Sequence, residues 1–390
     1  MKYIISFLVI SSLLFVNVNA QWVQTNGPSG GEVFTVALLS SKIFAGTERG
    51  IFATTNNGLN WTRTPFDSLT EVNALVVNGT NIYAGSGTGL YLSTNNGTSW
   101  AQTSLTNVYI LSLAVSDTRI YAGTWLQGIY YSLNSGQSWS HVPFSNQDVF
   151  SLAIDGTNIY AGAYGLYKST NNGQSWTQTS LGTQNVYSIL ISNSVIYAGT
   201  FQNGVYSSTN NGQTWIQTSL NNQFVWSLIK NNSYFFAGAD YNGVFLSTNN
   251  GLNWTQKNEG MGNQTVRSFL VAGTYLYAGT NTAVWKRLLS DFVEVKTIRN
   301  KIPKSYLLDQ NFPNPFNPIT TIRFEVPKAS FVTFKIYNEI GNEISTLINT
   351  RLSAGSYEIE FNGDNLSSGI YYYKIFAGDF TDTKKMVMIK

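Results

Sequence analysis

Three acidic residues stand at one repeated position along the chain and are the side chains best suited to acid–base chemistry. Glu32, Glu71 and Asp148 each lie one residue before a short apolar stretch of a repeating unit. A glycosidase needs two carboxylates at a defined separation, one acting as acid and the other as base or nucleophile. A hydrolase would therefore take its catalytic pair from these three residues. The hypothesis that we favour assigns the chain no catalytic residue.

A second group of side chains is suited to binding. In each repeat the connection expected between the second and third strands carries residues that differ from repeat to repeat. They are Glu48, Arg49, Trp125, Tyr164, Phe201, Asp240 and Tyr241. Aromatic rings stack on the C–H faces of sugars while polar groups bond the hydroxyls, and Trp and Tyr also dominate contacts between proteins. These residues predict a ligand-binding face, with packing between repeats as the alternative.

A third repeated position, on the first strand of each repeat, is more typical of packing between neighbouring repeats. It is occupied by Phe34, Asn73, Leu111, Phe150, Tyr187, Trp226 and Arg267.

Composition argues against several classes of function. The chain has no cysteine and one histidine, His141, so a thiol nucleophile, a metal site built on Cys or His and a Ser-His dyad are not expected. Residues 21–285 hold eight Lys and Arg against nine Asp and Glu, too few cations to neutralise a nucleic acid. We expect no cofactor, no metal and no nucleic-acid partner.

The candidate residues are positioned by an octapeptide of the form Ser-Thr-Asn-Asn-Gly-x-Ser-Trp. It recurs, with small changes, at Thr54 to Trp61, Ser93 to Trp100, Ser132 to Trp139, Ser169 to Trp176, Ser208 to Trp215 and Ser247 to Trp254. A period of just under forty residues is typical of propellers and solenoids. Between the octapeptides, alternating apolar and polar residues bounded by Gly, Asn and Asp predict four short strands in each repeat. The fold class expected is all-β.

The ends of the repeat region indicate a closed ring. A Tyr/Phe-Ala-Gly element marks seven repeats, but the seventh lacks the octapeptide and its fourth strand. The missing strand is matched by Trp22-Val23-Gln24-Thr25, because Trp22 lies 39 residues before Trp61. An open solenoid has no reason to split a repeat between its termini. We therefore predict a seven-bladed β-propeller over residues 21–286, closed by an N-terminal strand.

The octapeptide resembles the Asp-box of bacterial neuraminidase repeats, with Asn where that family usually has Asp. The positions are Asn56, Asn95, Asn134, Asn171, Asn210 and Asn249. The resemblance implies a propeller in which these turns are structural and lie opposite the ligand-binding loops. It stops at the fold, because the arginine cluster and the Arg-Ile-Pro motif of neuraminidases are absent. The repeats are also similar to those of photosystem II assembly-factor propellers, which again concerns the fold.

The regions outside the repeats suggest export. Lys2, an apolar run from Ile4 to Val16 and a short-residue ending at Ala20 predict a signal peptide over residues 1–20. Residues 287–304 carry no repeat and are expected to be a linker. Five to seven short strands predicted within residues 305–390 favour a small Ig-like β-sandwich.

The last 80 or so residues resemble the type A C-terminal sorting domain of the type IX secretion system. The resemblance rests on Asn311-Phe312-Pro313-Asn314-Pro315-Phe316-Asn317-Pro318, Ser368-Gly369-Ile370-Tyr371-Tyr372-Tyr373 and the closing Lys384-Lys385-Met386-Val387. It implies passage through the periplasm and the outer membrane, with the translocon as partner and Lys384, Lys385, Met386 and Val387 as the sorting signal. The mature protein would have no transmembrane segment.

Together these observations predict a secreted or surface-displayed propeller that recognises a glycan or a protein without catalysis. A carbohydrate-active hydrolase of the Asp-box type is the alternative, and a purely structural or adhesive surface role is a third.

Overall fold

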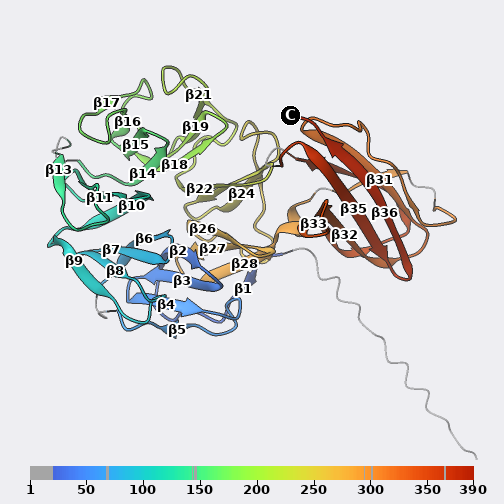
Figure 1. Ribbon diagram of the computed structural model, residues 1–390, viewed down its shortest axis with the longest axis horizontal. Helices are drawn as coiled ribbons and strands as arrows, with labels where there is room; N and C mark the ends of the chain where they lie inside the picture. Colours follow the sequence, from blue (N-terminus) through green and yellow to red (C-terminus); the bar gives the residue numbers. More distant parts are fainter. Residues whose placement is uncertain are drawn as a thin grey trace, which may run out of the picture.

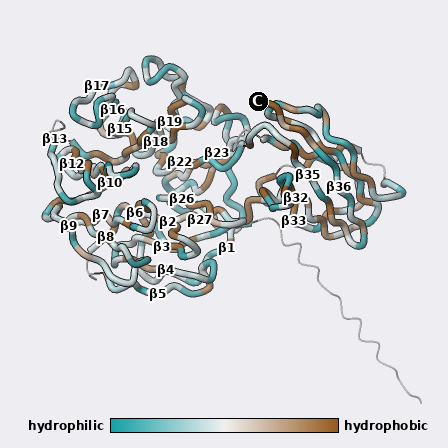
Figure 2. Tube along the Cα trace, viewed as in Figure 1, coloured by the Kyte–Doolittle hydropathy of each residue, from teal (hydrophilic) through white to brown (hydrophobic). Residues whose placement is uncertain are grey.

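The computed structural model describes residues 21–66, 70–142, 144, 147–293, 295–299, 302–363 and 366–390. The predicted signal peptide, residues 1–20, lies outside them. Regular structure in the described residues is almost entirely β, as predicted, with one short 3-10 helix, η1 (Leu289–Phe292). The sheets form a ring followed by a separate pair of sheets, and hydrophobic residues follow the strands while many connecting loops are hydrophilic (Figures 1 and 2).

Within the described residues the ring contains seven four-stranded antiparallel sheets. Their first strands are β2 (Val33–Leu39), β6 (Val72–Asn78), β10 (Ile110–Ser116), β14 (Ser151–Asp155), β18 (Val186–Ser192), β22 (Val225–Asn231) and β26 (Val266–Ala272). Each first strand contacts the next around the circle, and β26 contacts β2. The circuit of sheets is therefore closed.

The other strands follow in chain order within each sheet, apart from β1. The second strands are β3 (Lys42–Thr47), β7 (Asn81–Ser86), β11 (Arg119–Thr124), β15 (Asn158–Ala163), β19 (Val195–Thr200), β23 (Tyr234–Ala239) and β27 (Tyr275–Thr280). The third strands are β4 (Gly50–Thr54), β8 (Gly89–Ser93), β12 (Ile129–Ser132), β16 (Gly165–Ser169), β20 (Gly204–Ser208), β24 (Gly243–Ser247) and β28 (Val284–Leu288). The outer strands are β5 (Thr62–Arg63), β9 (Ala101–Thr106), β13 (Ser140–Val142), β17 (Thr177–Gln178), β21 (Ile216–Gln217), β25 (Thr255–Gln256) and β1 (Val23–Gln24).

The strand β1 closes the ring as the sequence predicts. It pairs antiparallel with β28, Val23 opposite Lys286 and Gln24 opposite Trp285. The side chain of Trp22 is only 1% exposed, and its indole N–H donates to the carbonyl of Lys257 at 2.7 Å. An open edge of β28 would leave backbone groups unpaired, so this strand both pairs the edge and fills the last interface of the ring.

The octapeptide turns are held by their own side chains. In the fourth turn the Asn171 Oδ1 accepts the Ser175 N–H at 2.9 Å, and the Ser169 hydroxyl accepts the Gly173 N–H at 2.9 Å. Gly173 has φ +82°, a conformation that favours glycine. The closing Trp packs between neighbouring sheets; Trp100, for example, lies against a cluster built from β2–β4 and β6–β7. The turns lie on the face formed by the third-to-fourth connections. Their recurring side chains shape the turn and pack the sheets together.

The C-terminal pair of sheets forms a sandwich around its own core. One sheet has the order β29 (Lys296–Arg299), β34 (Gly355–Asn362), β31 (Ile319–Val326), β30 (Leu307–Leu308). The other has the order β33 (Glu343–Leu352), β32 (Ser330–Asn338), β35 (Gly369–Ala377), β36 (Phe380–Met388). Phe324, Phe334 and Tyr373, from both sheets, are almost completely buried in the shared core.

The segment 287–304, expected to be a linker, carries structure in its described residues. Phe292 of η1 packs in the core of the ring, 6.1 Å from the Trp22 ring centroid and 4.8 Å from that of Phe236. A few residues later β29 pairs with β34 of the sandwich. This segment therefore contacts the ring at one end and the sandwich at the other. Its mixed charges did not indicate these contacts.

Candidate ligand-binding face

The alternation of strands puts two sets of connections on one face of the ring. Because consecutive strands run antiparallel, the second-to-third and fourth-to-first connections lie together, opposite the octapeptide turns. We call this side the loop face. It carries every residue that the sequence analysis proposes for binding or catalysis: Glu32, Glu48, Arg49, Glu71, Trp125, Asp148, Tyr164, Phe201, Asp240 and Tyr241.

Aromatic side chains are displayed by the second-to-third connections of four consecutive sheets. Trp125 is 52% exposed, Tyr164 53%, Phe201 37% and Tyr241 66%. We call these four residues the aromatic arc. In three of these connections a residue other than glycine takes positive φ: Leu126 at 59°, Gln202 at 62° and Tyr241 at 49°. This left-handed conformation is uncommon for such residues.

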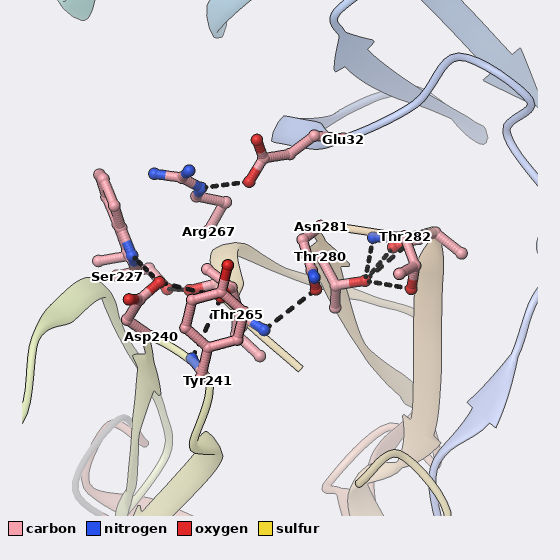
Figure 3. A network of polar contacts seen from close by, with 12 residues as sticks. Glu32, Ser227, Asp240, Tyr241, Thr265, Arg267, Thr280, Asn281 and Thr282 are labelled. Atoms are coloured by element: carbon pink, nitrogen blue, oxygen red, sulfur yellow. Dashed lines mark hydrogen bonds and ion pairs between the residues drawn. The ribbon is translucent and has the colours of Figure 1, made fainter. Parts of the chain in front are cut away.

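An arginine from the first-strand position organises one side of the loop face. The Arg267 Nε donates to Glu32 Oε1 at 2.7 Å, joining β26 to the residue before β2 (Figure 3). The guanidinium carbon lies 3.6 Å from the ring centroid of Trp226. Both ends of the ion pair are largely screened from solvent, with side-chain exposures of 22% for Arg267 and 19% for Glu32. The carboxylate of Glu32 thus fixes the guanidinium over the indole.

Asp240, on the neighbouring sheet, also holds Trp226 in place. Its Oδ1 accepts the indole N–H of Trp226 at 3.1 Å and the hydroxyl of Thr265 at 2.9 Å. The same Thr265 hydroxyl accepts the backbone N–H of Tyr241 at 3.1 Å, and its backbone N–H donates to Asn281 Oδ1 at 3.1 Å. Figure 3 shows Asp240, Thr265 and Asn281 linked in this way beside Tyr241. The network positions one aromatic residue of the core and one of the arc.

A cluster of rings lies beneath the exposed arc. The Tyr187 ring centroid is 4.2 Å from that of Phe150 and 4.8 Å from that of Trp226. Phe224 stacks on Trp226 at 4.0 Å and meets Phe201 of the arc at 4.8 Å. The contacts of Tyr187 with Phe150 and Trp226 run from sheet to sheet, as predicted for the first-strand position, whereas Phe224 and Trp226 belong to one sheet. Burial and the negative charge of Asp148 raise the pKa of Tyr187, so its hydroxyl stays neutral.

The carboxylates of Glu71 and Asp148 also hold aromatic segments. Glu71 accepts a hydrogen bond from the Tyr109 hydroxyl, whose ring centroid lies 5.6 Å from that of Trp125. Burial, followed by this bond to Glu71, raises the pKa of Tyr109 from 10.0 to about 12. Asp148 Oδ1 accepts the N–H of Leu126 at 3.0 Å, next to Trp125. Both acids therefore stabilise the same exposed tryptophan.

The candidate acids come from three separate sheets, and each is engaged by a partner of its own. Glu32 bonds Arg267, Glu71 bonds Tyr109 and Asp148 bonds a backbone N–H. All three carboxylates thus accept a hydrogen bond within the folded ring. Within the described residues no group of three or more His, Asp or Glu side chains is arranged to hold a metal ion.

Glu48 and Arg49 lie apart from the arc. They border a hollow beside the first sheet together with Phe52, Trp61 and Arg63. The Arg63 guanidinium donates to the carbonyl of Arg49 at 3.0 Å, which ties the β3–β4 connection to the outer strand β5. Glu48 and Arg49 thus lie on the loop face at the first sheet, across the ring from the sheets that carry the aromatic arc.

Sequence reasoning missed the part that Arg267, Thr265 and Leu126 play in the face. Arg267 was expected only to pack between sheets, and Leu126 was not singled out. The available signal was the position itself: Arg267 is the single cation among the seven residues of the first-strand set. The other six positions hold four aromatic rings, one leucine and one amide. A charge at such a position requires a partner, since burying it unpaired is costly.

The proposed sorting residues lie on the last strand, β36. Lys384, Lys385 and Val387 are partly or fully exposed, while Met386 is buried. The amides of Gln310 and Asn314 donate to the carbonyl of Lys385 at 2.7 and 3.4 Å, and the Val387 N–H donates to Asn314 Oδ1 at 2.8 Å. The Asn- and Pro-rich segment before β31 therefore covers this edge of the sheet.

Comparisons with known proteins agree with both parts of the architecture. Residues 310–390 match the family model of the secretion system C-terminal sorting domain. The fold resembles that of YCF48 from Cyanidioschyzon merolae, with TM-score 0.57 and 14% identity over 69% of this chain and 98% of that one. No curated protein matches the sequence.

Two further structures share the fold. PorZ, an essential surface component of the type-IX secretion system of Porphyromonas gingivalis, gives TM-score 0.55 and 12% identity over 94% of this chain and 61% of that one. A GH74 xyloglucanase from Xanthomonas campestris gives TM-score 0.57 and 13% identity over 78% and 59% of the two chains. At these identities the likeness concerns the fold alone.

The chain is thus a β-propeller that carries a C-terminal secretion sorting domain. The predicted resemblance to the type IX sorting domain is confirmed, and such a domain directs its protein to the cell surface. Among the residues that the structure describes, no helix is long and apolar enough to cross a membrane.

Proposed function

We propose that the propeller recognises a glycan or a protein through its loop face, without catalysis. One observation carries the proposal: the acids of this face hold aromatic residues in place. Glu32 fixes Arg267 over Trp226, Asp240 bonds Trp226, and Asp148 bonds the segment that displays Trp125. Rigid aromatic surfaces suit binding, because little conformational entropy is lost when a ligand covers them.

A carbohydrate-active hydrolase remains the alternative function. It would require two of Glu32, Glu71 and Asp148 to act on one bond, at a separation of about 5–10 Å. These carboxylates already hold neighbouring groups in place, and Glu32 does so in a half-buried ion pair with Arg267. Catalysis would require two of them to face one bond as well, so binding is the better-supported function.

Binding and turnover measurements on the full mature chain test the proposal. We expect binding to a glycan array or to an outer-envelope extract, no release of reducing sugar, and the same absence of turnover in Glu71→Gln and Asp148→Asn. Failure to bind any glycan or envelope component would contradict the recognition function. Release of sugar by the wild-type chain that disappears in either variant would establish the hydrolase instead.

We further propose that the seven sheets of the ring are seven blades and that the C-terminal sandwich is Ig-like. The closed circuit of first strands and the pairing of β1 with β28 support the first point. The domain boundaries 21–286, 287–304 and 305–390 stay a prediction, and the burial of Phe292 in the ring favours extending the propeller to that residue. The route through the periplasm, the translocon as partner and the sorting role of Lys384 to Val387 are proposals of the same kind.

A further inference from the structure

We propose that the ligand of the loop face is an uncharged, linear polysaccharide that lies along the aromatic arc of Trp125, Tyr164, Phe201 and Tyr241. The inference rests on the proposed binding function and names the chemical class of its ligand. Four observations support it: the placement of the rings, their fixed backbone, the charge of the face and the amides that flank the rings.

The rings form an unbroken series around the face. They come from the connections β11–β12, β15–β16, β19–β20 and β23–β24, one from each of four sheets that are neighbours in the circle. At the same place the other three sheets carry no ring: their connections contain Glu48 and Arg49, Gly87 and Thr88, and Asn281 and Thr282. Such a row of separate platforms fits an elongated ligand. Hot spots for a protein partner, in contrast, cluster at the centre of a dry patch.

Each ring stands on a backbone that is held by specific hydrogen bonds. The Trp125 N–H donates to the carbonyl of Tyr109 at 2.9 Å, and that of Phe201 to the carbonyl of Asn185 at 3.0 Å. The Tyr164 N–H donates to Gln147 Oε1 at 3.3 Å, and Tyr241 is held by the Thr265 hydroxyl at 3.1 Å. The exposed rings are therefore presented by ordered loops, as a preorganised binding site requires.

The local backbone conformation supports the same view. Tyr241 holds φ 49°, with its ring largely in solvent, at a position where glycine would cost less. A bulky residue kept in a sparsely populated conformation, and exposed, points to a role in function rather than in packing. Here the conformation turns an aromatic side chain outward at the end of the arc.

Charge argues against an anionic ligand. Among the described residues, the loop face carries six acids, Glu32, Glu48, Glu71, Asp148, Asp240 and Glu259, against three cations, Arg49, Lys257 and Arg267. The Arg267 guanidinium is already neutralised by Glu32. An acidic polysaccharide would be repelled by this surface, whereas a neutral sugar would meet no unfavourable field.

Amide side chains beside the rings supply partners for sugar hydroxyls. Gln127 follows Trp125 by two residues, Asn203 follows Phe201 by two and Asn242 follows Tyr241 by one. Part of their capacity is used within the protein: Asn203 and Asn242 each donate to the backbone carbonyl two residues before, and the Gln127 Oε1 accepts the Tyr130 hydroxyl. An amide can both donate and accept, so the group that is not used in this way can meet a sugar hydroxyl. Aromatic platforms flanked by amides combine the apolar and polar contacts that a pyranose ring offers.

The test uses the full mature chain and titration calorimetry with defined probes. Neutral gluco- and manno-oligosaccharides of increasing length are compared with oligogalacturonides of matched length. We expect affinity to rise with the length of the neutral chains, since a longer chain reaches more than one ring. Tyr164→Ala and Tyr241→Ala should each weaken binding about three- to tenfold, the effect of about 0.5–1.5 kcal/mol for one stacked ring.

Control variants separate the arc from general surface effects. Leu252 lies on an octapeptide turn and is 58% exposed, and Ile216 lies on an outer strand and is 68% exposed. Leu252→Ala and Ile216→Ala should therefore leave the affinity unchanged. Tighter binding of the oligogalacturonides would overturn the proposal, and so would neutral binding that both arc variants leave intact. Capture of an envelope protein through the arc, with no neutral glycan bound, would overturn it while leaving the recognition function standing. Absence of every ligand would overturn both.

Discussion

At the scale of single residues, the partner of an acidic side chain decides what it does. Glu32, Glu71 and Asp148 share a repeated position and a chemistry, yet each bonds a different donor: a guanidinium, a phenol and a backbone amide. Asp240, in a neighbouring connection, bonds an indole and a hydroxyl. What these acids share in the folded protein is that each stabilises a nearby aromatic residue.

Replacement of Asp240 tests this structural role. Asp240→Ala would leave the Trp226 indole and the Thr265 hydroxyl without their acceptor. Leaving buried donors unsatisfied costs about 1–3 kcal/mol, so we expect a loss of that size in the free energy of unfolding, measured with urea. The exposed Glu48→Ala serves as control and should change stability by less than about 0.5 kcal/mol. Equal stability of both variants would contradict the assigned role.

At the scale of elements, the second strand of each sheet buries a repeated ring. Tyr121, Tyr160, Tyr197 and Tyr277 begin the Tyr-Ala-Gly element, are 3% exposed or less, and pack between neighbouring sheets. Burial raises the pKa of all four, and that of Tyr277 reaches about 12 from the usual 10.0. These hydroxyls are therefore neutral in the folded ring at a pH that ionises them in the unfolded chain.

This difference predicts instability in alkali. Because the folded pKa is raised, the contribution of each tyrosine to stability is complete below pH 10 and is lost as the pH rises through its folded pKa, which for Tyr277 is about 12. Unfolding followed by tryptophan fluorescence should show a steep fall in stability over this window. Tyr277→Phe should make the fall shallower, whereas Tyr241→Phe, at a ring 66% exposed, should not. A pH-independent stability between 9 and 12 would refute the argument.

The closing strand is the second element with a testable energy. Trp22→Ala removes a side chain that is 1% exposed and packs on Phe292 and the last sheets of the ring. Truncation of a buried tryptophan costs about 3–5 kcal/mol, so a large drop in the free energy of unfolding is expected. Trp125→Ala deletes an equally large ring that is 52% exposed and should be nearly neutral for stability. Similar losses in both variants would argue against closure by β1.

At the scale of the whole molecule, the chain consists of two all-β parts, the ring and the C-terminal sandwich. The ring presents the loop face, and the sandwich carries the sorting domain matched by residues 310–390. The junction is not a free tether, because η1 packs in the ring and β29 joins the sandwich within a few residues. The proposed recognition function and the sorting domain thus belong to separate folds, and the described residues between them include η1 and β29.

Removal of the last strand tests the export role of the sandwich. Deletion of residues 384–390 removes half of β36 with the buried Met386 and Met388, so we expect the protein to remain in the periplasm. Fractionation of cells followed by immunoblotting measures this. Lys384→Ala with Lys385→Ala keeps the core and asks whether the charges themselves are read. Normal secretion of the deletion variant would contradict a sorting role for the terminus.

The repeats and strands of the ring could be predicted from the sequence, because their signals are local. The Asn and Gly of each octapeptide shape a turn within eight residues, strand alternation has period two, and Trp22 stands one repeat length before Trp61. The strands of the sandwich that bury alternate residues, such as β35 (Gly369–Ala377), were equally predictable. The strand β33 was not predicted, since EISTLINTRL buries only Leu347 and Ile348 on an edge of the sheet.

The partners of the candidate residues could not be predicted and became visible in the folded ring. Glu32 and Arg267 lie 235 positions apart in the chain and meet because the ring closes. Asp240 meets Trp226 within one sheet, but its bond to Thr265 joins two neighbouring sheets, and the packing of successive sheets brings the four aromatic connections onto one face in circular order. Contacts between the last and the first sheet depend on the return of the chain after a full turn, and no local sequence pattern predicts which side chains meet between sheets. A repeat position can thus be read from the sequence, whereas the partner that gives it a function comes from the closed ring.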